Sequence, residues 1–416
     1  MKKIAITNAY TWYNKGDAGI LLGIIETLKK VYNNDVEFTI LSFTPNEDKK
    51  RYCKDGAIKN VYSNILNPHP YKHTKFGKIM AMMKIFFKML KTQFMLKFNF
   101  KRAVKKDETL KALNDSDIII VCGGGFLGGK KFDSLEHLYQ IYVNTKFNKP
   151  VYLMGTSIEP IKNRIIKYYT EKVLKKLDYI FARETITEKY LSEFIPKEKY
   201  TLIPDMAFML ENEDMEFPFV KDLREKSNIL VGITVRNWNF PNVVDKNKAR
   251  ENYIFQMKEF MEYYIKNENA IFIFVPQVIV SYASDTDIAK EIKEKMDDKY
   301  KDAFIIRNDD WSPLEIKTLI SKFDFFVGTR MHSNIFATSM YVPTLAIAYE
   351  KKTNGIMQTV GQENYVLEID NLQSKKMIEK FDALISNRDS IRKQLILRRK
   401  EIKKEIFYKT NIIFKK

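Results

Sequence analysis

Residues 117–129 read DIIIVCGGGFLGG, an apolar run of strand length that ends directly in three glycines. An unbroken apolar run is typical of a strand that is buried on both faces of a parallel sheet. Glycines at its end let backbone N–H groups approach an anion or a ribose, because no Cβ stands in the way. A tight strand-to-helix turn explains Gly123, Gly124 and Gly125 as well. The run matches neither a P-loop nor G-x-G-x-x-G, so nucleotide binding does not follow from it.

Similar apolar strands alternate with helical segments on both sides of this run. The first series of predicted strands covers residues 4–7, 36–43, 117–122, 151–155, 179–182 and 200–203. The second series covers residues 229–235, 270–275, 303–306, 323–327 and 344–348. Strands spaced in this way need crossover helices and therefore form parallel sheets. The pattern predicts an α/β protein of two doubly wound, Rossmann-like domains that face a cleft.

The expected domain boundaries follow changes in composition. Residues 1–210 and 225–373 form the two predicted domains, and the acidic, proline-containing stretch 211–228 is a plausible linker. A basic insertion at about residues 70–105 interrupts the first domain. Residues 374–416 read as a basic helical tail that could pack back on the first domain.

The net charge of +18 is concentrated in two segments. Residues 56–106 contain 12 Lys and Arg and no acid, and residues 375–416 add a net +9. The remaining 323 residues carry a net charge of −3, so a nearly neutral body bears two basic segments. Such a balance suggests nucleic acid, an anionic membrane or an acidic substrate as the partner.

Residues 79–100, IMAMMKIFFKMLKTQFMLKFNF, favour the membrane among these partners. Lys84, Lys88 and Lys91 share one stripe of a helix that is otherwise rich in Phe, Met and Leu. Such a helix fits an interfacial anchor whose lysines meet acidic head groups, with residues 79–102 on the bilayer. A core helix and a helix that covers a partner subunit remain alternatives. Nucleic acid fits poorly, because residues 79–102 contain a single Arg, Arg102, and no polar face that could contact bases.

Other partners and cofactors lack a sequence signal. Cys53 and Cys122 form no motif, and the four histidines make no metal-ligand cluster with them. We therefore expect no metal and no cofactor. The first residues, MKKIAITNAY, lack the apolar core of a signal peptide, and no stretch of 18 uncharged apolar residues exists. The expected location is the cytoplasm, peripheral at the inner face of the cell membrane.

Cations follow four of the predicted strands. Arg183, Arg236 and Arg330 come directly after or close to a strand end, and Lys352 follows the strand TLAIA. A solvated surface explains any one of them, but four equivalent positions suggest a small anionic ligand, because ligands bind beyond the carboxyl ends of parallel strands. His332 accompanies Arg330 and can titrate near neutral pH. Asp205 and Gln277 lie at comparable strand ends.

Several short motifs, in order and spacing, resemble the polysaccharide pyruvyl transferase family over nearly all of residues 1–370. They are Asn14-x-Gly16-Asp17, Gly123-Gly124-Gly125, Ala182-Arg183-Glu184, Pro204-Asp205, Pro276-Gln277 and Arg330-x-His332. The stretch 343–361, PTLAIAYEKKTNGIMQTVG, is similar too, with Lys352 at the family's lysine position. The basic insertion and the C-terminal tail depart from the family pattern, which puts the acceptor in doubt more than the donor.

The resemblance implies a fold similar to two-domain GT-B glycosyltransferases. It also implies transfer of a pyruvyl group from phosphoenolpyruvate to two sugar hydroxyls, leaving a ketal and releasing phosphate. Arg183, Arg236, Arg330 and Lys352 would match this anion, and His332 would act as general acid or only bind phosphate. Asp17, Glu159 and Asp205 are candidate bases or partners of sugar hydroxyls. The implied substrate-binding residues are Asn14, Gly16, Gly123, Gly124, Gly125, Arg183, Asp205, Arg236, Gln277, Arg330 and Lys352. The acceptor sugar, which could be lipid-linked, stays open.

Two other functions compete with this one. A GT-B glycosyltransferase that uses a nucleotide sugar would share the fold, and Glu350 could then bind the ribose. A non-catalytic, membrane-associated scaffold for polysaccharide assembly would explain the basic segments but not the cations at four strand ends. Nucleic-acid binding is a distant further alternative.

Overall fold

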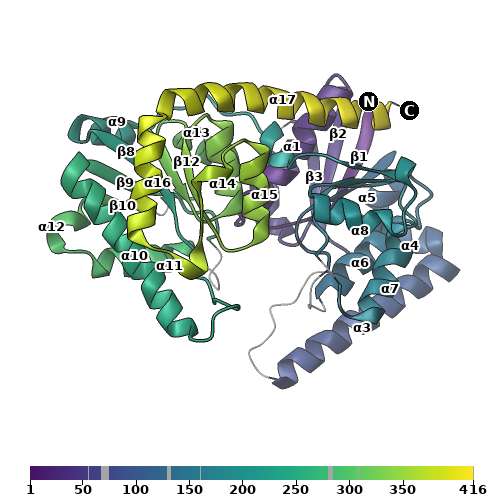
Figure 1. Cartoon of the computed structure of the whole chain (residues 1–416). Coiled ribbons are helices and arrows are strands. Elements are labelled where there is room, and N and C mark those ends of the chain that lie inside the picture. The colour runs from purple at the N-terminus through teal and green to yellow at the C-terminus, as the bar shows by residue number, and fades with distance from the viewer. Residues whose placement is uncertain are drawn as a thin grey trace. The chain divides into compact units, whose positions relative to one another are not determined.

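The computed structural model describes residues 1–54, 56–66, 75–128, 133–159, 161–279, 284–307 and 309–415. Two parallel sheets, each with helices on both faces, organise these residues (Figure 1). The chain divides into a first unit, Met1–Trp12, Ile20–Met209 and Glu405–Lys416, and a second unit, Tyr13–Gly19 and Leu210–Lys404. The predicted pair of doubly wound, Rossmann-like domains is confirmed. The start of the predicted insertion, residues 70–74, lies outside the described residues, as does Gly129.

The sheet of the first unit has seven strands in the order β3-β2-β1-β4-β5-β6-β7, all parallel. The strands are β1 (Lys2–Ala9), β2 (Val36–Ser42), β3 (Ile58–Ser63), β4 (Ile118–Cys122), β5 (Val151–Thr156), β6 (Tyr179–Ala182) and β7 (Tyr200–Leu202). The winding direction reverses between β1 and β4, which makes the carboxyl ends of these strands the usual place for a ligand.

Helices and short 3₁₀ turns connect these strands. They are α1 (Lys15–Val31), α2 (Pro45–Tyr52), α3 (Lys75–Phe98), α4 (Phe100–Lys106), α5 (Glu108–Asp115), α6 (Asp133–Asn144), α7 (Arg164–Leu174), α8 (Thr185–Ser192), η1 (Lys197–Lys199) and η2 (Met206–Met209). No helix of the described residues is both long enough and apolar enough to cross a membrane.

The sheet of the second unit repeats the same topology with six strands, in the order β10-β9-β8-β11-β12-β13. The strands are β8 (Ile229–Thr234), β9 (Ala270–Phe274), β10 (Phe304–Ile306), β11 (Phe325–Gly328), β12 (Thr344–Ala348) and β13 (Val366–Glu368). The intervening elements are α9 (Pro218–Lys226), α10 (Lys246–Glu268), α11 (Asp285–Lys295), α12 (Asp298–Lys301), α13 (Pro313–Ile320), α14 (Met331–Ser339), α15 (Lys351–Thr359), η3 (Glu363–Tyr365) and η4 (Ile369–Asn371). The winding direction reverses between β8 and β11.

The cores of both units are built from strands that are buried over their whole length. Every residue of β4 (IIIVC), β9 (AIFIF) and β12 (TLAIA) is buried. Because helices cover both faces of a doubly wound sheet, these strands are apolar throughout instead of alternating. Their carboxyl ends can therefore present polar residues only in the loops that follow.

Three parts of the sequence fold differently from expectation. The strands β3 and β13 were not predicted, because IKNVYS is polar and VLE is only three residues long. The presumed linker 211–228 contains helix α9, which begins at Pro218. Proline favours the first turn of a helix, so the same residue that suggested a linker starts this helix.

The basic tail forms two helices, α16 (Ser374–Ser386) and α17 (Arg388–Phe414). One face of α17 is buried, at Ile391, Leu395, Ile402 and Ile406. Arg399 and Lys403 both pair with Glu211, and Arg388 pairs with Asp324, so part of the tail's charge is neutralised within the second unit. In the first unit, the ring of Phe414 at the end of α17 packs on Tyr152 and Phe181.

Candidate functional site

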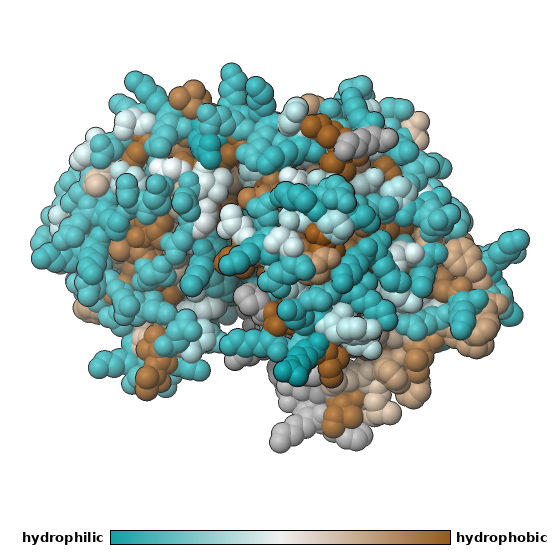
Figure 2. All heavy atoms as spheres, turned by 45° about the vertical axis from the view of Figure 1, so that its right-hand side comes forward, coloured by the Kyte–Doolittle hydropathy of each residue, from teal (hydrophilic) through white to brown (hydrophobic). Residues whose placement is uncertain are grey.

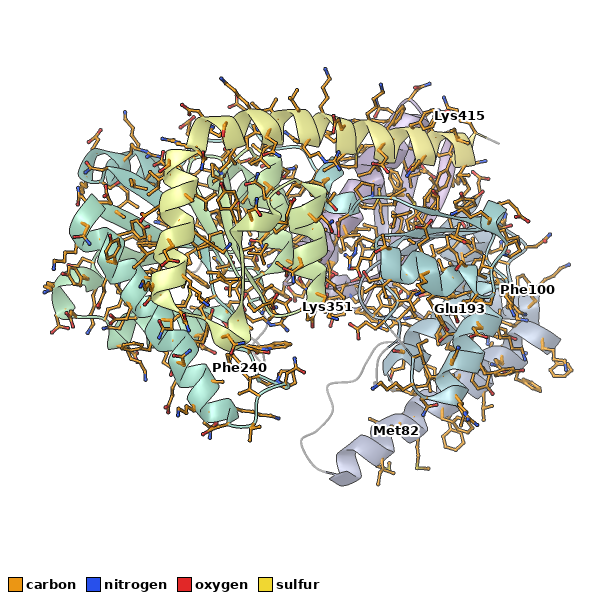
Figure 3. The ribbon with its side chains drawn as sticks, viewed as in Figure 1. Met82, Phe100, Glu193, Phe240, Lys351 and Lys415 are labelled. Carbon is orange, nitrogen blue, oxygen red and sulfur yellow. The ribbon has the colours of Figure 1, made fainter. Side chains whose placement is uncertain are left out.

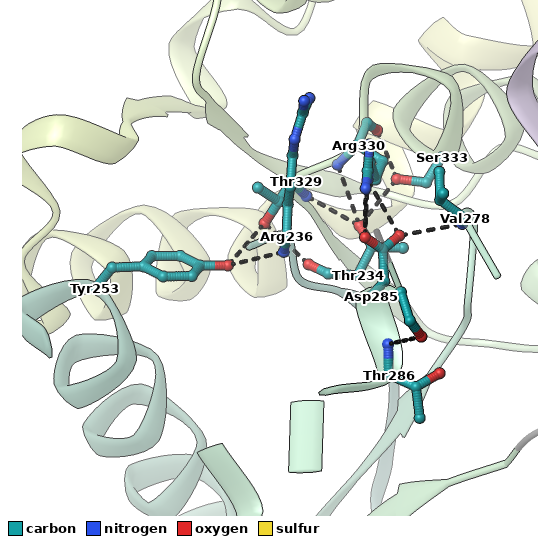
Figure 4. Close-up of polar contacts among 10 residues, drawn as sticks. Thr234, Arg236, Tyr253, Val278, Asp285, Thr286, Thr329, Arg330 and Ser333 are labelled. Atoms are coloured by element: carbon teal, nitrogen blue, oxygen red, sulfur yellow. Dashed lines mark hydrogen bonds and ion pairs between the residues drawn. The ribbon is translucent and has the colours of Figure 1, made fainter. Parts of the chain in front are cut away.

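Hydrogen bonds fix the loops after β8 and β11 to each other at the switch point of the second sheet (Figure 4). The backbone N–H of Thr329 donates to the Thr234 hydroxyl at 2.9 Å, and the Thr329 hydroxyl donates to the Thr234 carbonyl at 2.9 Å. The hydroxyls of Thr234 and Ser333 are 3.0 Å apart. These bonds set where α14 begins, and therefore where Arg330 and His332 lie.

Arg330 forms a two-pronged ion pair with Asp285, the first residue of α11. Its Nε lies 3.1 Å and 3.2 Å from the two carboxylate oxygens, and its Nη2 also bonds the carboxylate. Asp285 is 1% exposed, and its carboxylate also accepts the backbone N–H of Val278 at 3.2 Å. Burial raises the pKa of Asp285, and the charge of Arg330 opposes this shift. Arg330 is therefore oriented by a carboxylate, and the pair has no net charge.

Arg236, after β8, has a different environment. Its guanidinium lies 4.0 Å from the ring centroid of Tyr349 and 4.8 Å from that of Trp238. Among the described residues, no carboxylate lies within ion-pair distance of this guanidinium. Burial lowers the pKa of Arg236 from its usual value, and the charge of neighbouring Arg330 acts in the same direction. An arginine stays protonated under such conditions. A bound anion would therefore replace the hydration that the guanidinium loses on burial.

The segment around Asn14 lies on the second sheet rather than on the first. Asn14 forms an antiparallel bridge with Val278, and the N–H of Lys15 donates to the Gln277 carbonyl at 2.9 Å. A Cβ added at Gly16 would overlap the imidazole of His332. Glycine at this position is therefore what allows His332 to approach the first turn of α1. Four predicted site residues, Asn14, Gly16, Gln277 and His332, are thus brought together.

Two further polar groups belong to this segment. The Asn14 amide donates to the Asp17 carboxylate at 2.5 Å, which holds both side chains at the start of α1. The Lys15 side chain is 1% exposed, and its ammonium pairs with Asp310 at 2.6 Å. Lys15 was not predicted as a site residue, although it lies between two that were.

The Gln277 side chain is buried, and its amide makes no hydrogen bond among the described residues. It is 2% exposed, and among the described residues neither its Oε1 nor its Nε2 has a hydrogen-bond partner. A buried amide that makes no hydrogen bond costs about 1–3 kcal/mol. Its position after β9, beside Lys15 and Asn14, makes it a candidate ligand group.

Lys352 lies in the first turn of α15, after β12. Its ammonium is 3.8 Å from the carboxylate of Glu350, which is 41% exposed. Tyr349, directly after β12, is the residue that covers Arg236. The loops after β8 and β12 therefore meet above β11, the strand between them.

In the first unit, Arg183 and Asp205 bind each other. Nη1 of Arg183 lies 2.7 Å from a carboxylate oxygen of Asp205, and Nε and Nη2 donate to the Ser157 hydroxyl at 3.0 Å and 2.6 Å. The other oxygen of Asp205 accepts the N–H of Ala207 at 2.8 Å. Both side chains are at most 2% exposed, so Arg183 is a buried, neutralised cation. Its role in substrate binding stays a prediction.

The three-glycine run packs closely on the segment after β5. A Cβ added at Gly123 would overlap the carbonyls of Met154 and Gly155, and the carbonyl of Gly124 accepts the Ser157 N–H at 3.0 Å. Packing therefore explains Gly123 without a ligand, whereas Gly125 is exposed. Anion binding by this run stays a prediction, as does a role for Glu159.

His137, on α6, lies near the switch point of the first sheet and was not predicted. Its ring stacks on Phe126 at 4.3 Å, and its Nδ1 accepts a hydrogen bond from the Asn8 amide at 3.1 Å. Asn8 has a φ of 58°, which is uncommon for a residue other than glycine. Burial lowers the pKa of His137 to about 4, so the imidazole is neutral at pH 7.

The amino-acid sequence of the chain matches a known protein family. The sequence model of the polysaccharide pyruvyl transferase family matches residues 14–351. The amylovoran biosynthesis protein AmsJ of Erwinia amylovora is 22% identical over 409 residues, which cover 94% of each chain.

Solved structures share the fold at low sequence identity. UDP-GlcNAc 2-epimerase from Methanocaldococcus jannaschii aligns with a TM-score of 0.54 and 16% identity over 92% of both chains. Anabaena Alr3699/HepE, solved with UDP and glucose, aligns with a TM-score of 0.55 and 11% identity over 97% of this chain and 95% of that one. At such identities the likeness shows the GT-B-like fold and nothing about substrates.

Proposed function

The chain belongs to the polysaccharide pyruvyl transferase family, and we propose that it moves the pyruvyl group of phosphoenolpyruvate onto two hydroxyls of a sugar. The acceptor is part of a cell-surface polysaccharide or a lipid-linked glycan precursor. The products are a cyclic ketal and inorganic phosphate. The reaction as proposed uses no metal and no cofactor.

The observation that carries the proposal is the environment of Arg236. Phosphoenolpyruvate bears a phosphate and a carboxylate, and Arg236 is a cation without a carboxylate partner among the described residues. Together, Arg236, Arg330 and Asp285 carry one net positive charge. The amide of Gln277 and the N-terminus of α14 add hydrogen-bond donors near this charge.

In the proposed reaction, His332 protonates C3 of phosphoenolpyruvate, which makes C2 electrophilic. The first sugar hydroxyl adds to C2, and its proton passes to a base for which Asp17 is the candidate. The second hydroxyl then displaces phosphate from C2, and its proton leaves with the phosphate. General acid catalysis of this kind contributes about 10²–10⁴-fold to a rate.

A phosphate-release assay with phosphoenolpyruvate and a panel of lipid-linked glycans tests the activity. We expect His332→Ala to lower the rate at least 100-fold while the unfolding transition stays within a few degrees of the parent. Arg330→Ala is a less clean variant, because it would leave the buried carboxylate of Asp285 without its cation. Parent-like turnover in His332→Ala would remove the proposed general acid.

A nucleotide-sugar glycosyltransferase is the second candidate, since the structural relatives include proteins solved with UDP. Glu350 is exposed enough to reach a ribose. The nucleobase of a nucleotide sugar would also need an aromatic side chain to stack on. The guanidinium of Arg236 already lies over the two nearby rings, Trp238 and Tyr349. Thermal-shift measurements with phosphoenolpyruvate and with UDP- and CMP-sugars separate the two functions. Stabilisation by a nucleotide sugar alone would favour the glycosyltransferase.

We also propose that the protein works as a peripheral protein at the inner, anionic face of the cell membrane. The support is the acid-free block of residues 56–106, which carries 12 basic residues. Charge reversal of Lys84, Lys88 and Lys91 to Glu should strongly reduce sedimentation with anionic vesicles, because each lysine near such a surface contributes about 1 kcal/mol. Sedimentation that the reversal leaves unchanged would contradict this location. A non-catalytic scaffold would also bind vesicles, but it would release no phosphate from phosphoenolpyruvate.

A further inference from the structure

Helix α3 packs on the first unit through one narrow stripe. Ile85 is buried, and Met89 and Leu96 pack against the same core. The Tyr139 hydroxyl donates to the carbonyl of Met89 at 2.9 Å, which ties α3 to α6. Residues spaced by three and four share one face of a helix, so this stripe explains how α3 is held but not the rest of its surface.

The face of α3 opposite this stripe is apolar and exposed. Each of its large side chains is between 42% and 65% exposed, namely Ile79, Met80, Met82, Met83, Phe86, Phe87, Leu90, Phe94 and Phe98. Figure 2 shows this patch as brown spheres at the lower right, and in Figure 3 the side chain of Met82 projects away from the helix. Water-soluble surfaces rarely expose so many adjacent apolar side chains.

A groove lies along α3, where it runs beside α6. Its volume is about 570 Å³, within the roughly 300–1,000 Å³ of small-molecule sites. Its lining is largely apolar and consists of Leu90, Gln93, Phe94, Leu96, Lys97, Tyr142, Val143 and Lys146. Leu90 and Phe94 belong to both the groove and the exposed face, so the groove is continuous with the apolar patch.

Lysines lie at this groove, and none of them has an acidic partner in the part of the chain that the structure describes. Lys97 and Lys146 are part of its lining, and the ammonium groups of Lys146 and Lys176 lie 4.5 Å and 5.3 Å from the ring centroid of Tyr142. Among the described residues, none of these three lysines forms an ion pair. An apolar groove with unpaired cations complements a molecule that has a hydrocarbon chain and an anionic head.

We infer that this groove binds the lipid part of the acceptor, a single hydrocarbon chain that ends in a phosphate. The chain lies against Leu90, Phe94 and Val143, and the phosphate lies at Lys97 and Lys146. The inference rests on the proposed function and deepens it, because it makes the acceptor lipid-linked. A peptide helix could cover the apolar face, but it would not explain two lysines in the groove lining that form no ion pair among the described residues.

Titration with farnesyl phosphate, below its micelle concentration and without phosphoenolpyruvate, tests the groove. We expect saturable binding that is at least tenfold weaker for farnesol and absent for inorganic phosphate. Leu90→Trp, which fills the groove, and Lys97→Glu combined with Lys146→Glu should each weaken binding at least tenfold. Phe87→Trp is the matched control on α3 outside the groove, and it should leave the affinity unchanged.

Two results would overturn the inference. Unchanged affinity in Leu90→Trp would mean that farnesyl phosphate adsorbs to the exposed face and not to the groove. Equal affinity for a two-chain anionic phospholipid would mean that the groove takes bilayer lipid rather than the acceptor's chain. Circular dichroism and the melting temperature of each variant show that it is folded. Phosphate release with a water-soluble sugar acceptor is measured separately, so failure of the proposed function and failure of the groove remain distinguishable.

Discussion

The carboxyl edges of the two sheets differ in how their polar groups are satisfied. In the first unit, Arg183 is neutralised by Asp205, and His137 is bonded to Asn8. In the second unit, the guanidinium of Arg236 lies over two adjacent aromatic rings, and Gln277 is buried without a hydrogen bond among the described residues. The topology is the same in both units, so the difference arises from the loops.

This difference shows that an arginine after a buried strand has two possible meanings. At Arg183 it completes a buried polar network that stabilises the loops of its own unit. At Arg236 no carboxylate among the described residues pairs with the guanidinium, and we propose that its charge serves a ligand. The first unit is therefore expected to respond to mutation through stability, and the second through binding.

The largest expected effect concerns the buried pair in the first unit. Arg183→Leu would leave the carboxylate of Asp205 buried without its cation and should lower the free energy of unfolding by about 3–5 kcal/mol. The double variant Arg183→Leu/Asp205→Leu removes both charges and should recover most of this loss. Denaturant unfolding of the three proteins measures both values. A loss below about 1 kcal/mol combined with abolished phosphoenolpyruvate turnover would make Arg183 a ligand residue after all.

The next largest expected effect is a pH dependence of stability that arises from His137 in the first unit. The pKa of His137 is lowered to about 4 in the folded chain, against about 6.5 unfolded, so the unfolded state binds more protons between these values. Its contribution to stability is complete above pH 6.5 and is lost as the pH falls toward 4. Between pH 7 and pH 5 we expect a loss of about 2 kcal/mol that His137→Gln abolishes.

Unfolding curves of the parent and His137→Gln at both pH values isolate this contribution. If His137→Gln lost as much stability between pH 7 and pH 5 as the parent does, then His137 would not be the group that titrates.

The smallest expected effect concerns the buried amide of Gln277 in the second unit. Gln277→Leu replaces a buried amide that lacks partners by an apolar group of similar size, and should raise the free energy of unfolding by about 1 kcal/mol. The same variant should weaken phosphoenolpyruvate binding. Thermal unfolding and titration of phosphoenolpyruvate measure the two changes. Destabilisation by more than about 1 kcal/mol would show that the amide has a structural role.

Much of the fold could be predicted from sequence because the buried strands are long and apolar. Runs such as IIIVC and TLAIA, repeated in alternation with helical segments, are typical of a doubly covered parallel sheet. The strands β3 (IKNVYS) and β13 (VLE) were not predicted, because the first is too polar and the second too short to show hydrophobic periodicity. Helix α9 escaped because Pro218 ends a linker as readily as it starts a helix.

The candidate site was predictable in its residues but not in their pairing. Arg183, Asp205, Arg236 and Arg330 stand out as polar residues after strands. That Asp285 would bind Arg330, or that Tyr349 would cover Arg236, depends on contacts between loops 45 and 113 residues apart. His137 gave no signal, because its partner Asn8 lies 129 residues away. Such contacts follow from the order of the strands, which one sequence does not encode in any local pattern.

The most direct test of the account is titration of phosphoenolpyruvate into the parent protein and Arg236→Met, which needs no acceptor. Methionine keeps an unbranched apolar chain against Trp238 and Tyr349 and removes the charge. We predict saturable binding to the parent, a dissociation constant raised about 100-fold in the variant, equivalent to about 2.7 kcal/mol, and a nearly unchanged free energy of unfolding. Equal affinity of the two proteins for phosphoenolpyruvate, or no binding to the parent, would contradict the assignment of this site.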